Sequence, residues 1–366
     1  MRITSLSGSG FRNLDDFSLE FDRSKNIFIG PNGAGKTNML EALYYLCIGR
    51  SMRINAEDVQ LVRFDRGLLR LEGRAESSQG PLSVEVGYDK AEKRLKINGE
   101  VQQKLSELIG RMPVVSLSPE DDELCKAGPA VRRRFLDLAI SQFSKAYLAD
   151  LQDYRRVLQQ RNRLLLDWRD GRSQGESLDA WNRQLCGSGL RIVKKRLAVI
   201  DGLKELAGGR YARIAGGAER LGLRYHYSCQ VEPGEPYETA WQRALADNAQ
   251  FERMRGTTMY GPHRDDLEIT IAGLRARSFG SQGQQRSAAI ALKLAEADLL
   301  AAELKEKPVV LLDEIFAELD GSRGANLVEQ LDPGHQVFIA SAHDNGVSES
   351  FAIRKFRVES GRVTAA

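Results

Sequence analysis

Residues 26–37 read NIFIGPNGAGKT, and this stretch decides the expected fold of the 366-residue chain. A short strand-like run comes before Gly30, and the apolar residues of 38–49 recur at helical spacing after Thr37. A glycine-rich loop between a strand and a helix, in the pattern G-x-x-x-x-G-K-[ST], is typical of a phosphate-binding loop. The pattern therefore predicts a nucleotide-binding α/β domain rather than a chance glycine-rich turn.

The loop supplies most of the candidate nucleotide-binding residues. Its glycines let backbone N–H groups converge on phosphate oxygens, and the N-terminus of the following helix adds positive potential. Lys36 is expected to reach the β- and γ-phosphates of ATP, and the Thr37 hydroxyl is expected to bind Mg²⁺. The complete candidate set in this loop is Gly30, Pro31, Asn32, Gly33, Ala34, Gly35, Lys36 and Thr37.

An apolar run at residues 309–312 ends in two carboxylates, Asp313 and Glu314. In proteins with a phosphate-binding loop, an aspartate at such a strand end holds Mg²⁺. The neighbouring Glu314 is placed to polarise the attacking water as a general base. The alternative is a buried strand that ends in a solvated acidic turn, and the phosphate loop elsewhere in the chain favours the catalytic interpretation.

The pattern along the chain changes twice. Residues 1–120 contain short strands with one helix, residues 129–213 are almost entirely helical, and strands alternate with helices again from Gly256 onward. Alternating buried strands and helices indicate a parallel α/β sheet. We therefore expect one discontinuous head domain from residues 1–120 and 256–366, interrupted by a mostly helical arm at 121–255.

Composition excludes several classes of protein. The chain is 42% hydrophobic and 28% charged, with 34 Gly and 10 Pro, which excludes collagen-like and wholly disordered proteins. It has no run of 18 uncharged apolar residues and no apolar signal segment, so we expect a cytoplasmic protein without a membrane span. The four cysteines lie far apart in sequence, which argues against a disulfide framework or a zinc ribbon.

A third motif, SQGQQR at residues 281–286, comes just before a long Ala/Leu-rich helical stretch. Ser281 and the following backbone N–H groups are suited to contact a phosphate at a helix N-terminus. Because Lys36 already serves the chain's own nucleotide, this second site makes sense for a nucleotide bound to another subunit. The alternative is that Ser281 only caps the helix.

In this order, the motifs resemble the ABC-type ATPase head, and within that superfamily the RecF family. The resemblance covers essentially the whole chain. It implies an α/β P-loop ABC-type ATPase head with an antiparallel β subdomain, interrupted by a mostly α-helical insertion without a long coiled coil. The motifs that carry it are GFRNL (10–14), GPNGAGKT (30–37), SPED (118–121), AVRRRFLD (130–137), GPHRDDL (261–267), SQGQQR (281–286) and LLDEIFAELD (311–320).

The resemblance also implies roles for individual residues. In the family, ATP is sandwiched between two heads of a homodimer, which would place Ser281, Gly283 and Gln284 on the partner's γ-phosphate. Arg12 would lie beside the nucleotide, and Asp320 would support communication across the dimer. His343, as the switch histidine, would join Lys36 and Glu314 in catalysis. ABC heads usually also carry a Mg²⁺-ligating glutamine near the start of the helical lobe, and residues 114–121 contain none.

Positive charge is concentrated in the helical segment. Residues 129–213 contain 18 basic and 9 acidic residues, a net charge of +9, whereas the whole chain has a net charge of +3. Such an asymmetry is expected of a protein that binds the phosphate backbone without reading base sequence, although a solvated helix pair is the alternative. The candidate DNA contacts are Arg132, Arg133, Arg134, Arg155, Arg156, Arg161 and Arg163.

The sequence therefore favours an ATP-dependent DNA-binding ATPase with weak, DNA-stimulated hydrolysis. The resemblance implies recombinational repair of single-strand gaps, replication-fork maintenance and SOS induction. RecR, acting with RecO, and indirectly RecA are the implied partners. A transporter's nucleotide-binding subunit is one alternative, but it does not need the basic segment. An SMC-like structural ATPase is the other, and it needs a coiled coil far longer than this chain provides. His263, within GPHRDD, fits either a structural or a head-coupling role.

Overall fold

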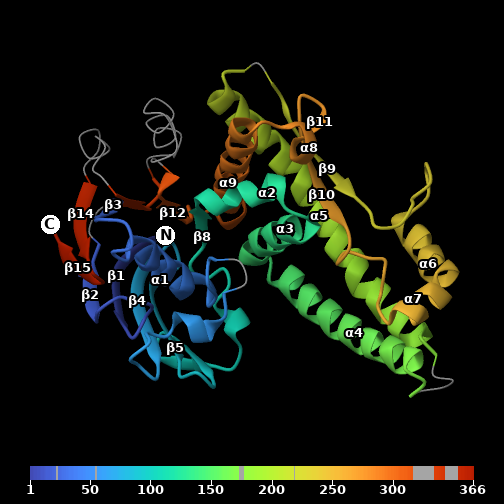
Figure 1. The fold of residues 1–366 in the computed structure, drawn as a ribbon, viewed down its shortest axis with the longest axis horizontal. Coiled ribbons are helices and arrows are strands. Elements are labelled where there is room, and N and C mark those ends of the chain that lie inside the picture. Colours follow the sequence, from blue (N-terminus) through green and yellow to red (C-terminus); the bar gives the residue numbers. More distant parts are fainter. Residues whose placement is uncertain (22–23, 54–55, 173–176, 218, 316–333, 343–352) are drawn as a thin grey trace. The chain divides into compact units, whose positions relative to one another are not determined.

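The computed structural model describes residues 1–21, 24–53, 56–172, 177–217, 219–315, 334–342 and 353–366 (Figure 1). The chain forms two compact units, one from residues 1–122 and 289–366 and the other from residues 123–288. The second boundary lies within a helix at Ala289, whereas the sequence pattern places it near Gly256. The difference arises because the strand after Gly256 pairs with a strand of the helical unit and so belongs to it.

The first unit contains a six-stranded sheet that carries the phosphate-binding loop. Its order is β15-β14-β3-β13-β12-β8, and its strands are parallel except for the β14–β15 pair. The strands β12 and β13 are buried along their whole length, as their uninterrupted apolar sequences predict. The bounds are β3 Lys25–Ile29, β8 Val114–Leu117, β12 Val309–Asp313, β13 Val337–Ser341, β14 Ile353–Glu359 and β15 Arg362–Ala365.

A second, antiparallel sheet in the same unit has the order β2-β1-β4-β5-β6-β7. The turn between β6 and β7 has positive φ at Asn98 (51°) and Gly99 (83°), the conformation that an Asn-Gly pair favours in a two-residue turn. The bounds are β1 Arg2–Ser9, β2 Phe17–Glu20, β4 Leu69–Ser77, β5 Gly80–Tyr88, β6 Lys93–Ile97 and β7 Glu100–Gln102.

Helix α1 (Lys36–Ile48) follows the phosphate-binding loop and packs against strands of both sheets. The sequence pattern places its apolar residues on one face, but the structure buries the helix on nearly all sides, including the charged Glu41. A helix between two sheets has no solvent face, which explains its nearly continuous apolar sequence. The helix therefore holds the loop at its N-terminus on a rigid support.

The second unit is mostly helical, with a three-stranded antiparallel sheet of order β11-β10-β9. Figure 1 shows its two longest helices, α4 and α5, packed side by side. The Ser144 side chain caps α4 by accepting a hydrogen bond from the Tyr147 backbone N–H, which separates α4 from α3. The bounds are α2 Glu123–Lys126, α3 Pro129–Phe143, α4 Lys145–Arg169, α5 Asp179–Ala215, β9 Leu221–His226, α6 Tyr237–Asp247, α7 Ala249–Arg255, β10 Asp266–Ile271, β11 Leu274–Arg275 and α8 Ala276–Phe279.

Helix α9 (Gln282–Leu304) contains the boundary between the two units. Among the described residues, no helix is long and apolar enough to cross a membrane. The GPHRDD motif (261–266) is partly buried in the helical unit, since Gly261, Pro262 and Asp265 are buried and Arg264 is exposed. Buried Arg196 of α5 donates to the Pro262 carbonyl at 2.8 Å, and Asp265 accepts from Tyr225 at 2.8 Å. The Tyr154 hydroxyl lies 2.6 Å from His263 Nδ1, and His263 Nε2 lies 3.2 Å from the Thr258 carbonyl. These contacts give the motif a structural role in joining two helices, α4 and α5, to the small sheet.

His263 should make this unit sensitive to acid. Burial lowers the pKa of His263 to about 4. In the unfolded chain the imidazole binds a proton below pH about 6.5, whereas in the folded chain it binds one only below about pH 4. The free energy of unfolding should therefore fall between these two pH values, by roughly 3 kcal/mol. Urea unfolding measured at pH 7 and pH 4.5 checks this result. His263→Gln should lose most of the pH dependence, whereas the control Gln250→Asn, at an exposed position of the same unit, should retain it. An unchanged pH dependence in His263→Gln would contradict the assignment.

Candidate functional site

The phosphate-binding loop has the backbone geometry that its glycines predict. Gly33 and Gly35 have φ values of 77° and 116°, in the region that favours glycine. A Cβ at Gly35 would also lie only 2.9 Å from Leu14 Cδ2, and a Cβ at Gly30 would lie 2.0 Å from the Val358 carbonyl oxygen. The loop is therefore held between the GFRNL segment and β14, where larger residues do not fit.

Lys36 is the first residue of α1, directly after the loop, and only 3% of its surface is exposed. Its ammonium donates to the Pro31 carbonyl oxygen at 3.1 Å and lies 3.4 Å from Glu314 Oε1. Glu314 has a φ of 47°, an uncommon conformation for a residue with a side chain and one that is often found at functional sites. The structure thus brings together a cation and a carboxylate that lie 278 positions apart in the sequence.

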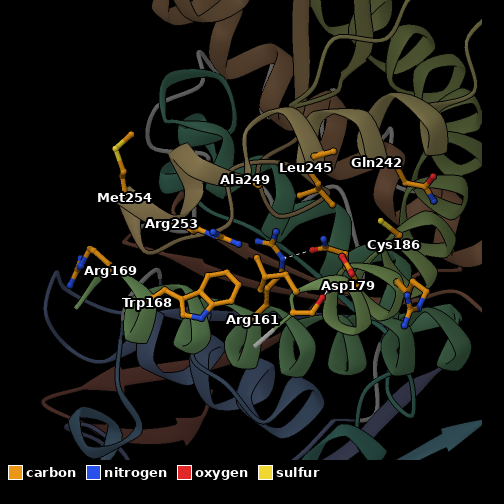
Figure 2. Close-up of a pocket in the computed structure, with 15 residues that line it drawn as sticks. Arg161, Trp168, Arg169, Asp179, Cys186, Gln242, Leu245, Ala249, Arg253 and Met254 are labelled. Atoms are coloured by element: carbon orange, nitrogen blue, oxygen red, sulfur yellow. Dashed lines mark hydrogen bonds between the residues drawn. The ribbon is translucent and has the colours of Figure 1, made fainter. Parts of the chain in front are cut away.

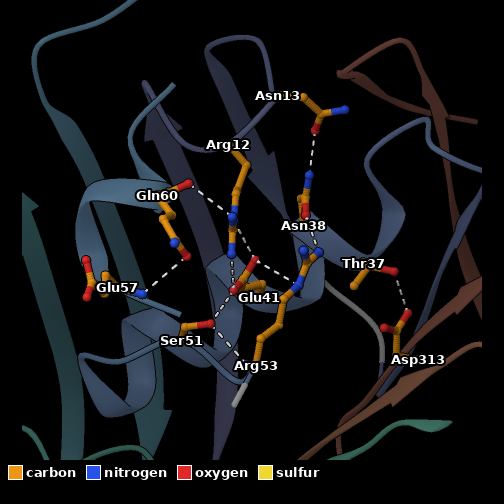
Figure 3. Close-up of polar contacts among 10 residues, drawn as sticks. All are labelled: Arg12, Asn13, Thr37, Asn38, Glu41, Ser51, Arg53, Glu57, Gln60 and Asp313. Atoms are coloured by element: carbon orange, nitrogen blue, oxygen red, sulfur yellow. Dashed lines mark hydrogen bonds and ion pairs between the residues drawn. The ribbon is translucent and has the colours of Figure 1, made fainter. Parts of the chain in front are cut away.

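Thr37 and Asp313 also meet at this site. The Thr37 hydroxyl donates to Asp313 Oδ1 at 2.9 Å (Figure 3). Burial raises the pKa of Asp313 to about 6, because a carboxylate is poorly solvated there. A hydroxyl and a carboxylate are the oxygen ligands that Mg²⁺ prefers, and a bound cation would favour the ionised form of Asp313. The two residues therefore fit the role of Mg²⁺ ligands.

Arg12 lies next to the loop, but its guanidinium is already bonded. Its Nε and Nη2 each donate to the Glu41 carboxylate at 3.0 Å, and Nη1 donates to the Gln60 carbonyl oxygen at 3.0 Å (Figure 3). Ser51 also donates to the fully buried Glu41, at 2.5 Å. This arrangement ties the GFRNL segment to α1, and a contact between Arg12 and a nucleotide stays a prediction.

A chain of side-chain contacts near the loop was not expected from the sequence. Asn38 donates to Asn13 Oδ1 at 2.7 Å, and Arg53 donates to Asn38 Oδ1 at 2.8 Å. The positive charge of Arg53 also favours the ionised form of Asp313. One signal was present in the sequence: a single glutamate, Glu41, in an otherwise apolar helix requires a buried basic partner. Which arginines supply that charge is visible only in the structure.

Residues 118–121 follow β8, at the position where ABC heads usually carry a glutamine. Leu117 pairs with Leu312 in the parallel sheet, so the end of β8 lies beside the end of β12. The Ser118 backbone N–H donates to Asp121 Oδ2 at 2.6 Å, which closes a turn at this strand end. The role that the glutamine has in other heads stays unassigned in this chain.

Ser281 and Gln284 form a reciprocal helix cap. The Ser281 backbone N–H donates to Gln284 Oε1 at 2.8 Å, and the Gln284 N–H donates to Ser281 Oγ at 3.3 Å. In the structure Ser281 therefore acts as a helix cap. A contact of Ser281, Gly283 and Gln284 with a nucleotide bound to a second copy stays a prediction. His343 and Asp320 lie outside the described residues.

Two of the candidate DNA contacts are corrected by the structure. Arg132 is 5% exposed and donates from Nε and Nη2 to the Asp266 carboxylate at 2.8 and 2.9 Å. Arg161 is 0% exposed and donates to Glu252 Oε2 at 2.6 Å and to Thr258 Oγ1 at 2.8 Å. A buried guanidinium with satisfied hydrogen bonds cannot reach a phosphate backbone. These two arginines hold the helical unit together instead.

The other candidates differ in exposure. Arg133 is half-buried and donates to the Asp265 carbonyl oxygen at 2.7 Å. The remaining four lie on the surface: Arg134, Arg155, Arg156 and Arg163. Two of these are near carboxylates, since Arg155 lies 3.7 Å from Asp137 and Arg156 lies 3.1 Å from Asp153. Exposed ion pairs of this kind are weak, so these side chains remain available to a polyanion.

Comparison with known proteins identifies the family. Similarity to an Smc head bound to the C-terminal winged-helix domain of ScpA (TM-score 0.58, 15% identity) shows only the shared fold, although it covers 100% of this chain and 97% of that one. A solved structure described as the recombination mediator protein RecF with ATP in the RecFOR pathway aligns with a TM-score of 0.92 and 32% identity, covering 100% of this chain and 97% of that chain.

The sequence comparisons agree. The DNA replication and repair protein RecF of Geobacillus thermodenitrificans is 37% identical over 371 residues, and the alignment covers 100% of both chains. RecF of Bacillus cytotoxicus is 37% identical over 369 residues, covering 99% of this chain and 98% of the relative. A family model described as the RecF/RecN/SMC N-terminal domain matches residues 2–364. With its phosphate-binding loop joined to Asp313 and Glu314 on one sheet, the chain belongs to the RecF family.

Proposed function

We propose that the chain is an ATP-dependent DNA-binding protein of recombinational repair, in which ATP joins two copies head to head. The observation that carries the proposal is the meeting of Lys36, Thr37, Asp313 and Glu314 at the phosphate-binding loop. These residues supply a cation, two oxygen ligands and a carboxylate in one place, which is the set that phosphoryl transfer requires. Support also comes from a relative whose solved structure contains ATP.

Each residue has a distinct task in this proposal. Lys36 stabilises the negative charge of the β- and γ-phosphates. Thr37 and Asp313 would hold Mg²⁺, which would help to neutralise that charge. Glu314 orients the attacking water. When ATP binds, the 3.4 Å contact between Lys36 and Glu314 must break, so that Lys36 can contact phosphate and Glu314 can contact water. We expect hydrolysis to be weak and stimulated by DNA, so that it acts as a switch.

The partner copy would complete the site. Because the chain's own loop already holds its nucleotide, Ser281, Gly283 and Gln284 would contact the γ-phosphate bound to the second copy. His343 would sense the same phosphate. Hydrolysis would then separate the heads and release DNA. RecR, acting with RecO, and indirectly RecA are the proposed protein partners, in line with the RecFOR pathway in which the solved relative is described.

Light scattering of the Glu314→Gln variant tests this proposal. The variant should bind ATP and form a long-lived dimer, because the amide keeps the shape of the side chain but cannot orient the water. ADP should leave it monomeric, and Ser281→Arg in the same background should prevent the dimer without affecting ATP binding. A monomer with ATP, with and without DNA, would refute ATP-driven dimerisation. Hydrolysis at the wild-type rate would show that Glu314 is not the base.

The exposed arginines of the helical unit should determine how strongly DNA binding depends on salt concentration. Each phosphate contact that is lost reduces the slope of log K against log salt by about 0.9 on duplex DNA. Arg155→Glu, Arg156→Glu and Arg163→Glu together should therefore flatten the slope by up to roughly 3, with little dependence on base sequence. Fluorescence anisotropy at several salt concentrations measures this slope.

A matched control separates this effect from net charge. Reversal of three exposed basic residues of the antiparallel sheet region, Arg94, Lys104 and Arg111, changes the total charge equally. The control should leave the slope within about 1 of wild type. Equal effects of the two triple variants would show that the arm is not the contact surface.

A further inference from the structure

The helical unit contains a pocket whose lining includes none of the residues assigned above to ATP chemistry. Helices α4, α5, α6 and α7 surround it, and its volume is about 1140 Å³ (Figure 2). This is large enough for several side chains of a ligand, because ligand pockets commonly have 300–1,000 Å³. The lining includes residues from all four helices, so the pocket is part of the tertiary fold.

The floor of the pocket is apolar. Leu178, Cys186 and Leu245 line it and are 7%, 4% and 2% exposed. Ala246 and Ala249, on α6 and α7, leave space above this floor because their side chains are small. Burial raises the pKa of the Cys186 thiol to about 11, so Cys186 acts as a small apolar group rather than a nucleophile. This surface suits an aliphatic or aromatic side chain.

The rim is positively charged. Arg169, Arg183 and Arg253 line the pocket, whereas Asp179 is the one acidic residue among the described residues of the lining. Within the described ranges of the chain, Arg183 and Arg253 have no carboxylate partner. The guanidinium of Arg161 is deeper and does not contribute free charge, because Glu252 neutralises it. Two guanidiniums beside an apolar floor favour an anionic ligand with an apolar part.

The N-terminus of α5 adds to this potential. Leu178 occupies the cap position of this 37-residue helix and offers no side-chain oxygen to the first turn. Ser177 accepts a hydrogen bond from the Asp179 backbone N–H at 3.1 Å, so one N–H of the first turn is satisfied. The partly capped positive end of the helix lies at the pocket, with Arg183 one turn along. Asp179 in the first turn offsets only part of this charge.

The geometry argues against a nucleic-acid base as the ligand. Single-stranded nucleic acid is commonly held by stacking on an exposed aromatic face. Trp168 is the aromatic side chain in the lining, and the Arg253 guanidinium lies 4.3 Å from the centre of its ring (Figure 2). Trp168 also packs against the cluster of Leu164, Leu165 and Leu178. Its ring therefore forms a wall of the pocket rather than a free stacking surface.

We propose that this pocket binds an acidic peptide segment of a partner protein, with at least two carboxylates flanking one apolar anchor. The anchor side chain lies on Leu178, Cys186 and Leu245, and the carboxylates pair with Arg183 and Arg253. Burial of an apolar anchor with charged groups at the rim is the usual arrangement of a protein-binding site. The inference is independent of the ATP site.

A labelled peptide tests the proposal directly. We would titrate the full-length chain into a fluorescein-labelled peptide of sequence EELFEE and follow anisotropy. Peptides SSLFSS and EEAAEE, which lack the charges or the anchor, should bind at least about tenfold more weakly. Arg253→Glu should weaken EELFEE binding by about tenfold or more, and Ala246→Trp should abolish it by filling the pocket from an exposed position. The control Arg163→Glu, on α4 outside the lining, should bind normally.

Three results would overturn the proposal. These are saturation not reached at about 1 mM EELFEE, equal binding by Ala246→Trp and wild type, and displacement of the peptide by a dT12 oligonucleotide whose own binding is lost in Ala246→Trp. The last would assign the pocket to DNA. ATP binding, measured on the same samples, should be unchanged in Arg253→Glu and Ala246→Trp. If the wild-type chain does not bind ATP, the proposed ATPase function is refuted, and the peptide result is unaffected.

Discussion

Lys36→Met is expected to reduce the affinity of the chain for ATP by at least about 100-fold. Hydrogen bonds to a charged group contribute about 1.5–3 kcal/mol each, and the ammonium is expected to contact both the β- and γ-phosphates. Methionine fills a similar volume without the charge, and Lys36 is nearly buried, so no neighbouring water replaces the contact. Titration with a fluorescent ATP analogue measures the change in affinity.

The matched control is Lys104→Met, an exposed lysine in the same unit, which should bind ATP like wild type. Circular dichroism and thermal unfolding should confirm that Lys36→Met is folded. The buried ammonium also contacts Glu314 and the Pro31 carbonyl, so a small change in stability of either sign is compatible with the assignment. Unchanged ATP affinity in a folded Lys36→Met protein would refute the role of the loop in binding.

Arg161→Met should destabilise the helical unit by about 3–5 kcal/mol. Removal of one partner of a buried ion pair leaves the other charge uncompensated, and Glu252 is 0% exposed. The loss includes the hydrogen bonds of Arg161 to Asn182 (2.8 Å) and Thr258 (2.8 Å). Urea unfolding followed by tryptophan fluorescence measures it specifically, because all three tryptophans of the chain, at 168, 181 and 241, lie in this unit.

The neighbouring Arg163 provides the control. It lies two residues along the same helix and is exposed, so Arg163→Met should change the free energy of unfolding by less than about 0.5 kcal/mol. Arg161→Met combined with Glu252→Met should recover part of the loss, since both charges are then removed. A stable Arg161→Met protein with weakened DNA binding would instead restore Arg161 as a DNA contact.

The motifs of the ATP site could be predicted from the sequence because their information is local. The loop of residues 30–37 requires its glycines for backbone reasons, and β12 requires its apolar run for burial on both faces. Both features are visible without knowledge of distant contacts. The meeting of Lys36 with Glu314 is less local, but parallel strands place their carboxyl ends at one edge of the sheet, so this too follows from the pattern.

The helical unit shows the opposite case. Helix α4 contains four arginines of the candidate set, at 155, 156, 161 and 163, and the sequence does not distinguish them. Arg161 alone among these four is buried. Helical spacing predicts which residues share a face, but the identity of the face that packs inward depends on partners that are far apart in the sequence. For Arg161 these partners are Asn182, Glu252 and Thr258.

The sequence by itself determined the family, the α/β class, the phosphate-binding loop and the carboxylates of its strand end, because each depends on residues that are contiguous or strictly spaced. Only the tertiary structure decided the second domain boundary, the pairing of Arg12 with Glu41, and the division of the arginines between core and surface. The pocket among α4, α5, α6 and α7 belongs to the same group. These features depend on side chains brought together by packing, and burial is a property of the folded chain that no single segment carries.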